Sequence, residues 1–204
     1  MLKIQVVQGS LTDGDETLLV DASNTNVALG SGVSGAIRRA CGPGYQDQIS
    51  RALEEAHGGP MKPGEVLITD AGTHPRARLI AHIAVMDYRK GFTGSSFPTL
   101  DLIRTCWRNF FRAVGTLSEP VTVAMVALGA GTGQLGARES TEIAVESLVA
   151  YERDHAGASK LLGCTFYGFQ LFEYAAIADV VSAAFPEVLA TIPPDVRALF
   201  QRPP

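Results

Sequence analysis

Two glycine-rich segments hold the residue types with the clearest chemical meaning in this chain. The first is Gly30-Ser31-Gly32-Val33-Ser34-Gly35, and the second runs from Gly129 to Gly136. Each follows an apolar stretch and precedes a segment with helical character, so each loop is expected to open onto a helix N-terminus. The free N–H groups and positive partial charge of such an end suit a phosphate or carboxylate, and glycine lets the backbone approach it closely. The pair predicts an anion site built from main-chain groups.

Both segments contain the spacing G-x-G-x-x-G, which is typical of dinucleotide-binding domains. That fingerprint also requires an acidic residue at the end of the next strand, about 20 residues further on. This distance leads from the first loop to Glu54, inside an expected helix, and from the second to Asp154, before the last expected strand. Neither loop continues into the Gly-Lys-Ser/Thr of a P-loop. The sequence therefore argues against a dinucleotide-dependent dehydrogenase and against a P-loop nucleoside triphosphatase.

Alternating strands and helices are expected to position the two loops. Strands are predicted at Lys3–Gln8, Leu18–Ala22, Val66–Ala71, Leu79–Val85, Val121–Leu128 and Leu161–Phe169. Helices are predicted at Val33–Cys41, Gly44–Ala56, Thr99–Leu117, Ala137–Asp154 and Tyr174–Phe185. The long loop Asp87–Pro98 is a candidate lid. This alternation predicts a three-layer α/β domain with its ligand at the C-terminal ends of the strands. A Pro-rich tail over 191–204 is expected to have little to hold it.

The composition excludes several classes of protein. The 204 residues are 46% hydrophobic and 19% charged, with a net charge of −4 and no basic stripe. This argues against a dedicated surface for duplex nucleic acid. The first residues lack a signal-peptide pattern, and no apolar run approaches the length of a membrane span. Cys41, Cys106 and Cys164 are odd in number and far apart, which fits reduced thiols rather than disulfides or a zinc site. We expect a cytoplasmic domain with no membrane partner, metal or cofactor.

Several separated motifs resemble those of the macro domain family. They are Val6–Gly9, Ala22–Asn24, Leu29–Ile37, Pro63–Val66, Leu79–His82 and Ala127–Gly131. The resemblance covers about residues 1–181. It implies a mixed, mainly parallel sheet of about six strands between layers of helices, forming a single macro domain over 1–190. It also implies a cleft that binds ADP-ribose, because two glycine loops can hold a diphosphate without any lysine.

The resemblance implies ligand contacts from residues in both glycine loops and at the ends of three strands. These are Ser10, Leu11, Ala22, Asn24, Gly30, Gly32, Val33, Ser34, Gly35, Gly129, Ala130, Gly131, Thr132, Gly133 and Phe169. Asn24 would hold the distal ribose and is the candidate catalytic residue; a turn-forming role is the alternative. Phe169 or Phe172 would stack on adenine, with core packing of both as the alternative. His82 is expected to be structural, His74 a surface turn residue and Trp107 part of the core.

The chain departs from the family pattern at three positions. Ser10 stands where an Asp usually accepts a hydrogen bond from the adenine amino group. Ser34 and Arg38 stand where well-studied hydrolases of the family carry Asp and His. Arginine keeps its proton and serine needs an activating partner, so no base is evident there. Asp13, Asp15 and Asp21 lie nearby in the sequence, but nothing in the sequence places them at the distal ribose.

These departures leave two functions open. One is binding of ADP-ribose, free or attached to protein or nucleic acid, with hydrolysis of mono-ADP-ribosylated protein slow or absent and raised by Ser34→Asp. The alternative is a metabolite hydrolase acting on ADP-ribose 1''-phosphate or a related ADP-ribose ester. Neither interpretation calls for a cofactor.

Overall fold

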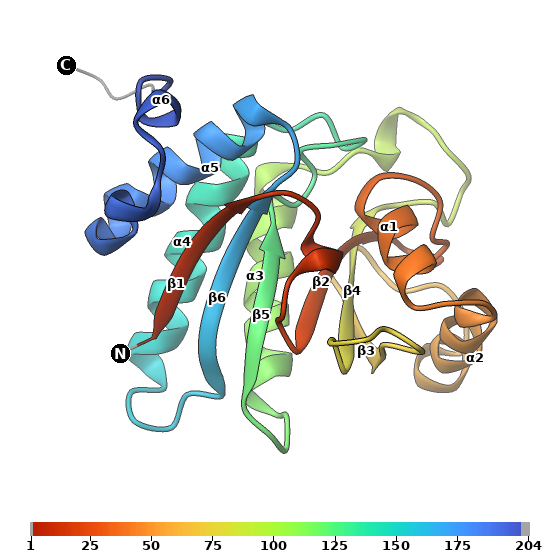
Figure 1. Ribbon diagram of the computed structural model, residues 1–204. Coiled ribbons are helices and arrows are strands. Elements are labelled where there is room, and N and C mark those ends of the chain that lie inside the picture. Colours follow the sequence, from red (N-terminus) through yellow and green to blue (C-terminus); the bar gives the residue numbers. More distant parts are fainter. Residues whose placement is uncertain (1, 201–204) are drawn as a thin grey trace.

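The computed structural model describes residues 2–200, which contain one six-stranded sheet (Figure 1). Its strands are β1 (Lys3–Gln8), β2 (Leu18–Asn24), β3 (Val66–Asp70), β4 (Leu79–Met86), β5 (Val121–Val126) and β6 (Leu161–Gly168). They lie in the order β1-β6-β5-β2-β4-β3, and only the β3–β4 pair among them is antiparallel. The expected mixed, mainly parallel sheet is confirmed.

Helices cover the two faces of this sheet. On one face lie α1 (Gly32–Ala40) and α2 (Tyr45–His57), and on the other lie α3 (Leu100–Gly115), α4 (Ala137–Asp154) and α5 (Leu171–Ala184) (Figure 1). Helix α1 packs against β2 and α2 against β3, whereas α3 packs on β4 and α5 on β1 and β6. The expected three-layer arrangement is confirmed.

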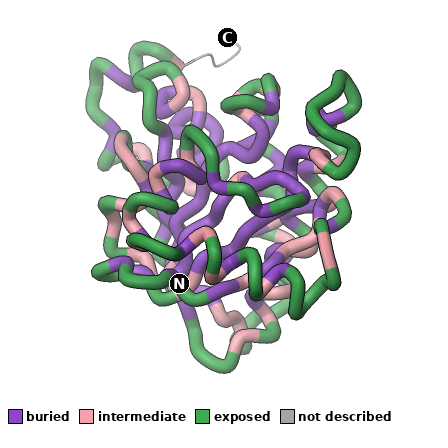
Figure 2. The backbone as a smooth tube through the Cα atoms, turned by 90° about the vertical axis from the view of Figure 1, so that its right-hand side faces the viewer, coloured by how far each residue is buried: buried purple, intermediate pink, exposed green. Residues whose placement is uncertain are grey.

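The core forms on both sides of the central strands. Val123, Ala124 and Met125 of β5 are completely buried, as a nearly continuous apolar strand between two helical layers requires. Trp107 of α3 is also completely buried, with its ring 5.5 Å from Phe110, so its expected place in the core is confirmed. Figure 2 shows the same distribution, with buried segments inside and exposed loops around them.

Local hydrogen bonds explain why some helix and strand boundaries differ from the predicted ones. Helix α1 starts after Ser31, which has the extended backbone of an N-cap residue but makes no side-chain capping bond. Helix α5 starts three residues earlier than predicted because Gln170 and Glu173 form a reciprocal capping box. Strand β5 ends at Val126 rather than Leu128, since the N–H of Ala130 bonds to the carbonyl of Ala127 in a turn.

The segment after α5 is held more firmly than expected. It forms a 3₁₀ turn over Pro186–Thr191 and the short helix α6 (Pro194–Arg197), which packs against α5. The side chains of Ile192 and Val196 are only 2% and 4% exposed. The expectation that little holds the tail is therefore wrong as far as Phe200, because these apolar residues extend the core. Residues 201–204 lie outside the described part of the chain.

The loop Asp87–Pro98 is partly ordered by its own residues. It contains a 3₁₀ turn over Gly94–Ser96, and Phe92 lies between Tyr88 and Phe97 with ring distances of 5.7 Å and 5.5 Å.

Within residues 2–200, no helix has both the length and the apolar character needed to cross a membrane.

Candidate functional site

A cleft of about 810 Å³ opens at the C-terminal ends of the parallel strands. Its walls come from the ends of β1, β4, β5 and β6, from Ala22 of β2, and from α1. Its volume is in the range of small-molecule sites, and its place in the sheet is the one that this topology favours. No residue of the loop Asp87–Pro98 lines it, so the lid interpretation gains no support. Within residues 2–200, no group of three or more His, Cys, Asp or Glu side chains could hold a metal ion.

The N-terminus of α1 forms one wall of the cleft. Gly32, Val33 and Ser34 all line it. Their N–H groups donate no hydrogen bond within the described part of the chain, and the first helical bond runs from the Gly35 N–H to the Ser31 carbonyl. Gly32 has a φ of +56°, a backbone conformation that favours glycine. This wall therefore offers three free donors and the positive end of a helix dipole.

The second glycine loop also lines the cleft, through Gly129, Gly131, Thr132 and Gly133. The Leu135 N–H bonds back to the Gly129 carbonyl and closes the loop. A side chain at Gly133 would meet that carbonyl oxygen at 2.6 Å, so only glycine fits there. The N–H groups of Gly131, Thr132 and Gly133 have no acceptor among the described residues. Two sets of free main-chain donors thus border one cleft.

The structure brings most of the predicted binding residues together. Those that line the cleft are Ser10, Leu11, Ala22, Gly32, Val33, Ser34, Gly129, Gly131, Thr132, Gly133 and Phe169. Asn24, Gly30, Gly35 and Ala130 are not among its lining residues. Gly35 has a different reason for being glycine: a side chain there would meet the Gly30 carbonyl oxygen at 2.8 Å.

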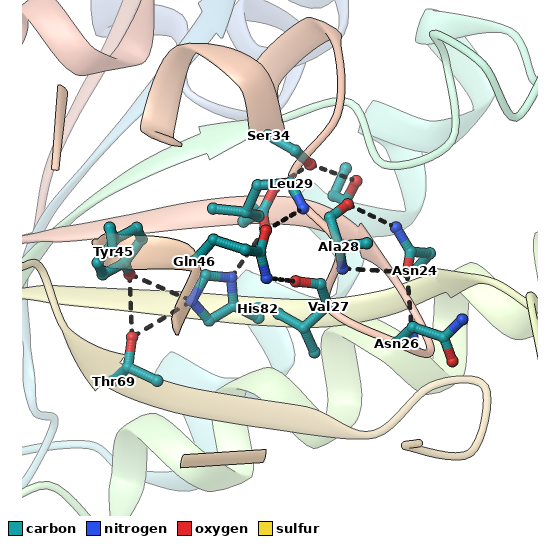
Figure 3. Close-up of polar contacts among 12 residues, drawn as sticks. Asn24, Asn26, Val27, Ala28, Leu29, Ser34, Tyr45, Gln46, Thr69 and His82 are labelled. Atoms are coloured by element: carbon teal, nitrogen blue, oxygen red, sulfur yellow. Dashed lines mark hydrogen bonds and ion pairs between the residues drawn. The ribbon is translucent and has the colours of Figure 1, made fainter. Parts of the chain in front are cut away.

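Asn24 shapes the turn between β2 and the first glycine loop. Its amide nitrogen donates to the Ala28 carbonyl at 2.9 Å, and its Oδ1 accepts from the N–H groups of Asn26 and Ala28 (Figure 3). Gln46 of α2 supports the same turn through Val27 and Leu29 (Figure 3). This geometry fits the turn-forming role of Asn24, because its side-chain oxygen already accepts two hydrogen bonds and Asn24 does not line the cleft.

The two candidate aromatic residues are separated by the structure. Phe169 is 66% exposed and lines the cleft where β6 ends, whereas Phe172 is 75% exposed and lies outside the lining. Core packing is therefore wrong for both. Ser10 lines the cleft near the end of β1, and its hydroxyl lies 2.8 Å from that of Thr12. It also caps the short turn Leu11–Asp13, all of which faces the cleft.

His74 is a brace for that turn rather than a surface residue, so the prediction for it was wrong. It is 8% exposed, and its Nε2 donates to the Thr12 carbonyl at 3.2 Å. Its Nδ1 accepts from the N–H groups of Ala77 and Arg76, which fixes a neutral tautomer. Burial lowers the pKa of His74 below its ordinary value.

The arginine at the cleft is Arg39. Arg38 donates from Nη1 to the Leu29 carbonyl at 3.3 Å and does not line the cleft, whereas Arg39 does. Ala36, Arg39 and Ala40 share the cleft face of α1 at helical spacing, a signal that was available in the sequence. The other lining residues that the sequence did not suggest are Gly9, Thr12, Asp13, Ser31, Val85, Met86, Val126, Ala127, Tyr167, Gln170 and Glu173.

A chain of buried polar groups runs from the cleft into the core. The Ser34 hydroxyl donates to Oδ1 of Asp21 at 2.6 Å, and Nδ1 of His82 lies 2.8 Å from Oδ2. Asp21 and His82 are fully buried and lie opposite each other on β2 and β4. The chain ends where Nε2 of His82 meets the hydroxyls of Thr69 and Tyr45, at 3.2 Å and 3.3 Å (Figure 3). His82 is buried in a strand interior, as predicted.

Comparisons with known proteins agree with this architecture. The family model of the macro domain matches residues 20–144. An O-acetyl-ADP-ribose deacetylase of Shigella flexneri is 30% identical over 154 residues, covering 76% of this chain and 82% of the relative. The Trypanosoma brucei macrodomain in complex with ADP-ribose is 25% identical with a TM-score of 0.70, covering 85% of this chain and 67% of that one. The Oceanobacillus iheyensis macrodomain with ADP shares the fold, with 20% identity, a TM-score of 0.72, and 90% and 92% coverage. This chain belongs to the macro domain family.

Proposed function

We propose that this chain binds ADP-ribose, free or as an ADP-ribosyl group on protein or nucleic acid. The observation that carries the proposal is the pair of free N–H sets, at Gly32–Ser34 and at Gly131–Gly133, that line one cleft. A diphosphate offers oxygens to both sets at once, and main-chain donors can bind it without a lysine. The T. brucei relative, whose structure contains ADP-ribose, supports the same ligand.

The ends of the cleft suggest the orientation of the ligand. The exposed ring of Phe169 offers a stacking surface for a base, and Ser10 lies at the end of β1, where the family carries its adenine-binding Asp. Ser34, at the position where well-studied hydrolases of the family carry Asp, also lines the cleft, and its hydroxyl lies 3.5 Å from the carbonyl oxygen of Ala22, another lining residue. We place the adenine near Phe169 and the distal ribose near Ser34.

Hydrolysis of an ADP-ribose ester is the second candidate function. It is favoured by the Ser34 hydroxyl, which lines the cleft while it bonds to a buried carboxylate. The S. flexneri relative, named as an O-acetyl-ADP-ribose deacetylase, supports an ester as substrate.

We also propose a cytoplasmic location for this chain. Three free thiols are buried in the structure, those of Cys41, Cys106 and Cys164, and free thiols are typical of proteins in a reducing compartment.

Calorimetric titration of the purified chain tests the binding proposal. ADP-ribose is expected to bind more tightly than ADP and AMP, because it offers the diphosphate and both sugars together. NAD, which carries a nicotinamide on the distal ribose, serves as the fourth ligand. If ADP-ribose binds no better than AMP, the diphosphate assignment of the two loops fails.

A further inference from the structure

We propose that Asp21 acts through the Ser34 hydroxyl as the proton acceptor for hydrolysis of an acyl ester on the ligand's distal ribose. The inference rests on the proposed binding and ester hydrolysis and adds to them a positioning residue, Asp21, that acts through Ser34. Ser34 joins the cleft lining to the chain that contains Asp21 and His82. It is therefore the residue that connects the buried Asp21–His82 pair to the cleft.

The direction of the hydrogen bonds fixes what Ser34 offers to the cleft. A carboxylate only accepts, so the Ser34 O–H and the His82 Nδ1–H both donate to Asp21. The 2.6 Å distance from Ser34 Oγ to Asp21 Oδ1 is typical of a charge-assisted bond. With its proton committed to Asp21, the Ser34 oxygen has only lone pairs left for the cleft. It can accept a hydrogen bond from a water molecule there.

This geometry differs from that of a Ser-His-Asp nucleophile. In such a triad the imidazole takes the proton from serine, with the carboxylate behind it. Here the carboxylate lies between, and His82 contacts Asp21 rather than Ser34. Ser34 is therefore assigned as a relay for a proton from water, and no acyl-enzyme intermediate is invoked.

Side chains from several elements surround the Asp21 carboxyl group. Ser34 of α1 and His82 of β4 contact Asp21 directly. Cys41, the C-cap of α1, and Tyr45 of α2 lie near enough for the Asp21 charge to raise their pKa values, and Thr69 of β3 contacts His82. Burial raises the pKa of Cys41 to about 12 and raises the pKa of Tyr45 as well, so both remain neutral at physiological pH. His82 is held by Thr69 and Tyr45 on its far side, which fixes the ring against Asp21.

The proposed step balances without another reagent. A water O–H bond breaks as its proton moves to Ser34 Oγ and the Ser34 proton moves to Asp21 Oδ1. The water oxygen bonds to the acyl carbon, and the resulting tetrahedral intermediate expels the ribose oxygen. That oxygen recovers the proton from Asp21 through Ser34, which leaves free ADP-ribose and the acid. General-base assistance of this kind contributes roughly 10²–10⁴-fold to a rate.

The test compares four variants of the full chain with O-acetyl-ADP-ribose and an ADP-ribosylated glutamate peptide as substrates. Ser34→Ala and Asp21→Asn are each expected to lower kcat by roughly 10²-fold. The double variant should be no slower than either single variant, since Asp21 acts only through Ser34. Affinity for ADP-ribose should change less than threefold. Ser23→Ala is the matched control, because the Ser23 hydroxyl is buried on β2, the strand that carries Asp21, but has no partner among the described residues.

Three results would overturn the inference. The first is a double variant whose loss in kcat is the product of the two single losses. The second is a wild-type kcat in Ser34→Ala. The third is a wild-type protein that binds ADP-ribose but hydrolyses neither ester. If Asp21→Asn does not fold, Ser34→Thr replaces it: this variant keeps the hydroxyl and should retain most of the rate that Ser34→Ala loses. Failure of wild type to bind ADP-ribose would instead overturn the proposed function, so the two failures are distinguishable.

Discussion

The Ser34 hydroxyl lies 2.6 Å from Oδ1 of Asp21, so a residue that lines the cleft is in direct contact with a fully buried carboxyl group. The contact joins the first turn of α1 to the interior of β2, thirteen residues earlier in the chain. The sequence offered no activating partner for Ser34, and Asp21 is that partner. The contact also changes the effect expected from Ser34→Asp.

Ser34→Asp is expected to destabilise the fold instead of raising turnover. The new carboxylate would lie against Asp21 in a site with little solvent, where like charges repel strongly. We expect the free energy of unfolding in urea to fall by about 2–4 kcal/mol at pH 8. The deficit should shrink toward pH 5, because protonation of one carboxyl relieves the repulsion. A variant as stable as wild type at pH 8 would show that the two side chains move apart.

Phe169→Ala is expected to weaken ADP-ribose binding by about 1–3 kcal/mol, the value of one base stacked on an aromatic ring. Phe172→Ala is the matched control, since Phe172 is also exposed but lies outside the cleft lining. Calorimetry of both variants provides the comparison. Equal losses, or a loss only in Phe172→Ala, would move the adenine away from the end of β6.

Stability should fall in mild acid because of His74. Its pKa is lowered by burial, so the folded state favours the neutral ring, whose Nδ1 accepts from Ala77. This contribution is fully present above the ordinary pKa of 6.5 and is lost as the pH falls below it. His74→Asn keeps an acceptor that does not titrate. Its free energy of unfolding should therefore change less between pH 7 and pH 5 than that of wild type, and parallel curves would refute the role of His74.

Arg39→Gln is expected to weaken ADP-ribose binding about fivefold at low salt, in line with ~1 kcal/mol for an exposed charge pair. The loss should disappear at high salt. Arg38→Gln, whose parent side chain bonds to the Leu29 carbonyl outside the cleft, should leave the salt dependence unchanged. The opposite pattern would show that Arg38, and not Arg39, faces the ligand.

The sequence was sufficient for the order of the elements and for both glycine loops. Periodicity and glycine spacing are local properties, and Ala137–Asp154 was predicted with its observed bounds. Local spacing also held unused signals: Ala36, Arg39 and Ala40 mark the cleft face of α1, and Ile192 and Val196 mark the buried side of the tail.

No local pattern in the sequence could have predicted the contact between Asp21 and His82. The two residues are 61 positions apart, and they meet because β2 pairs with β4 in a register that places them opposite each other. Strand order and register depend on the packing of the whole sheet, which spacing along the chain does not encode. The same limit applies to His74, whose partner at Thr12 is 62 positions away.

The most direct test of the central claim is calorimetric titration of ADP-ribose into Gly131→Glu. Gly131 lines the cleft, and a side chain there would meet nothing within 4 Å, so the variant should fold while its carboxylate repels the diphosphate. Gly94→Glu is the matched control, with equal open space at a glycine outside the cleft. We predict wild-type affinity in Gly94→Glu and no measurable binding in Gly131→Glu. Wild-type affinity in a folded Gly131→Glu would contradict the account.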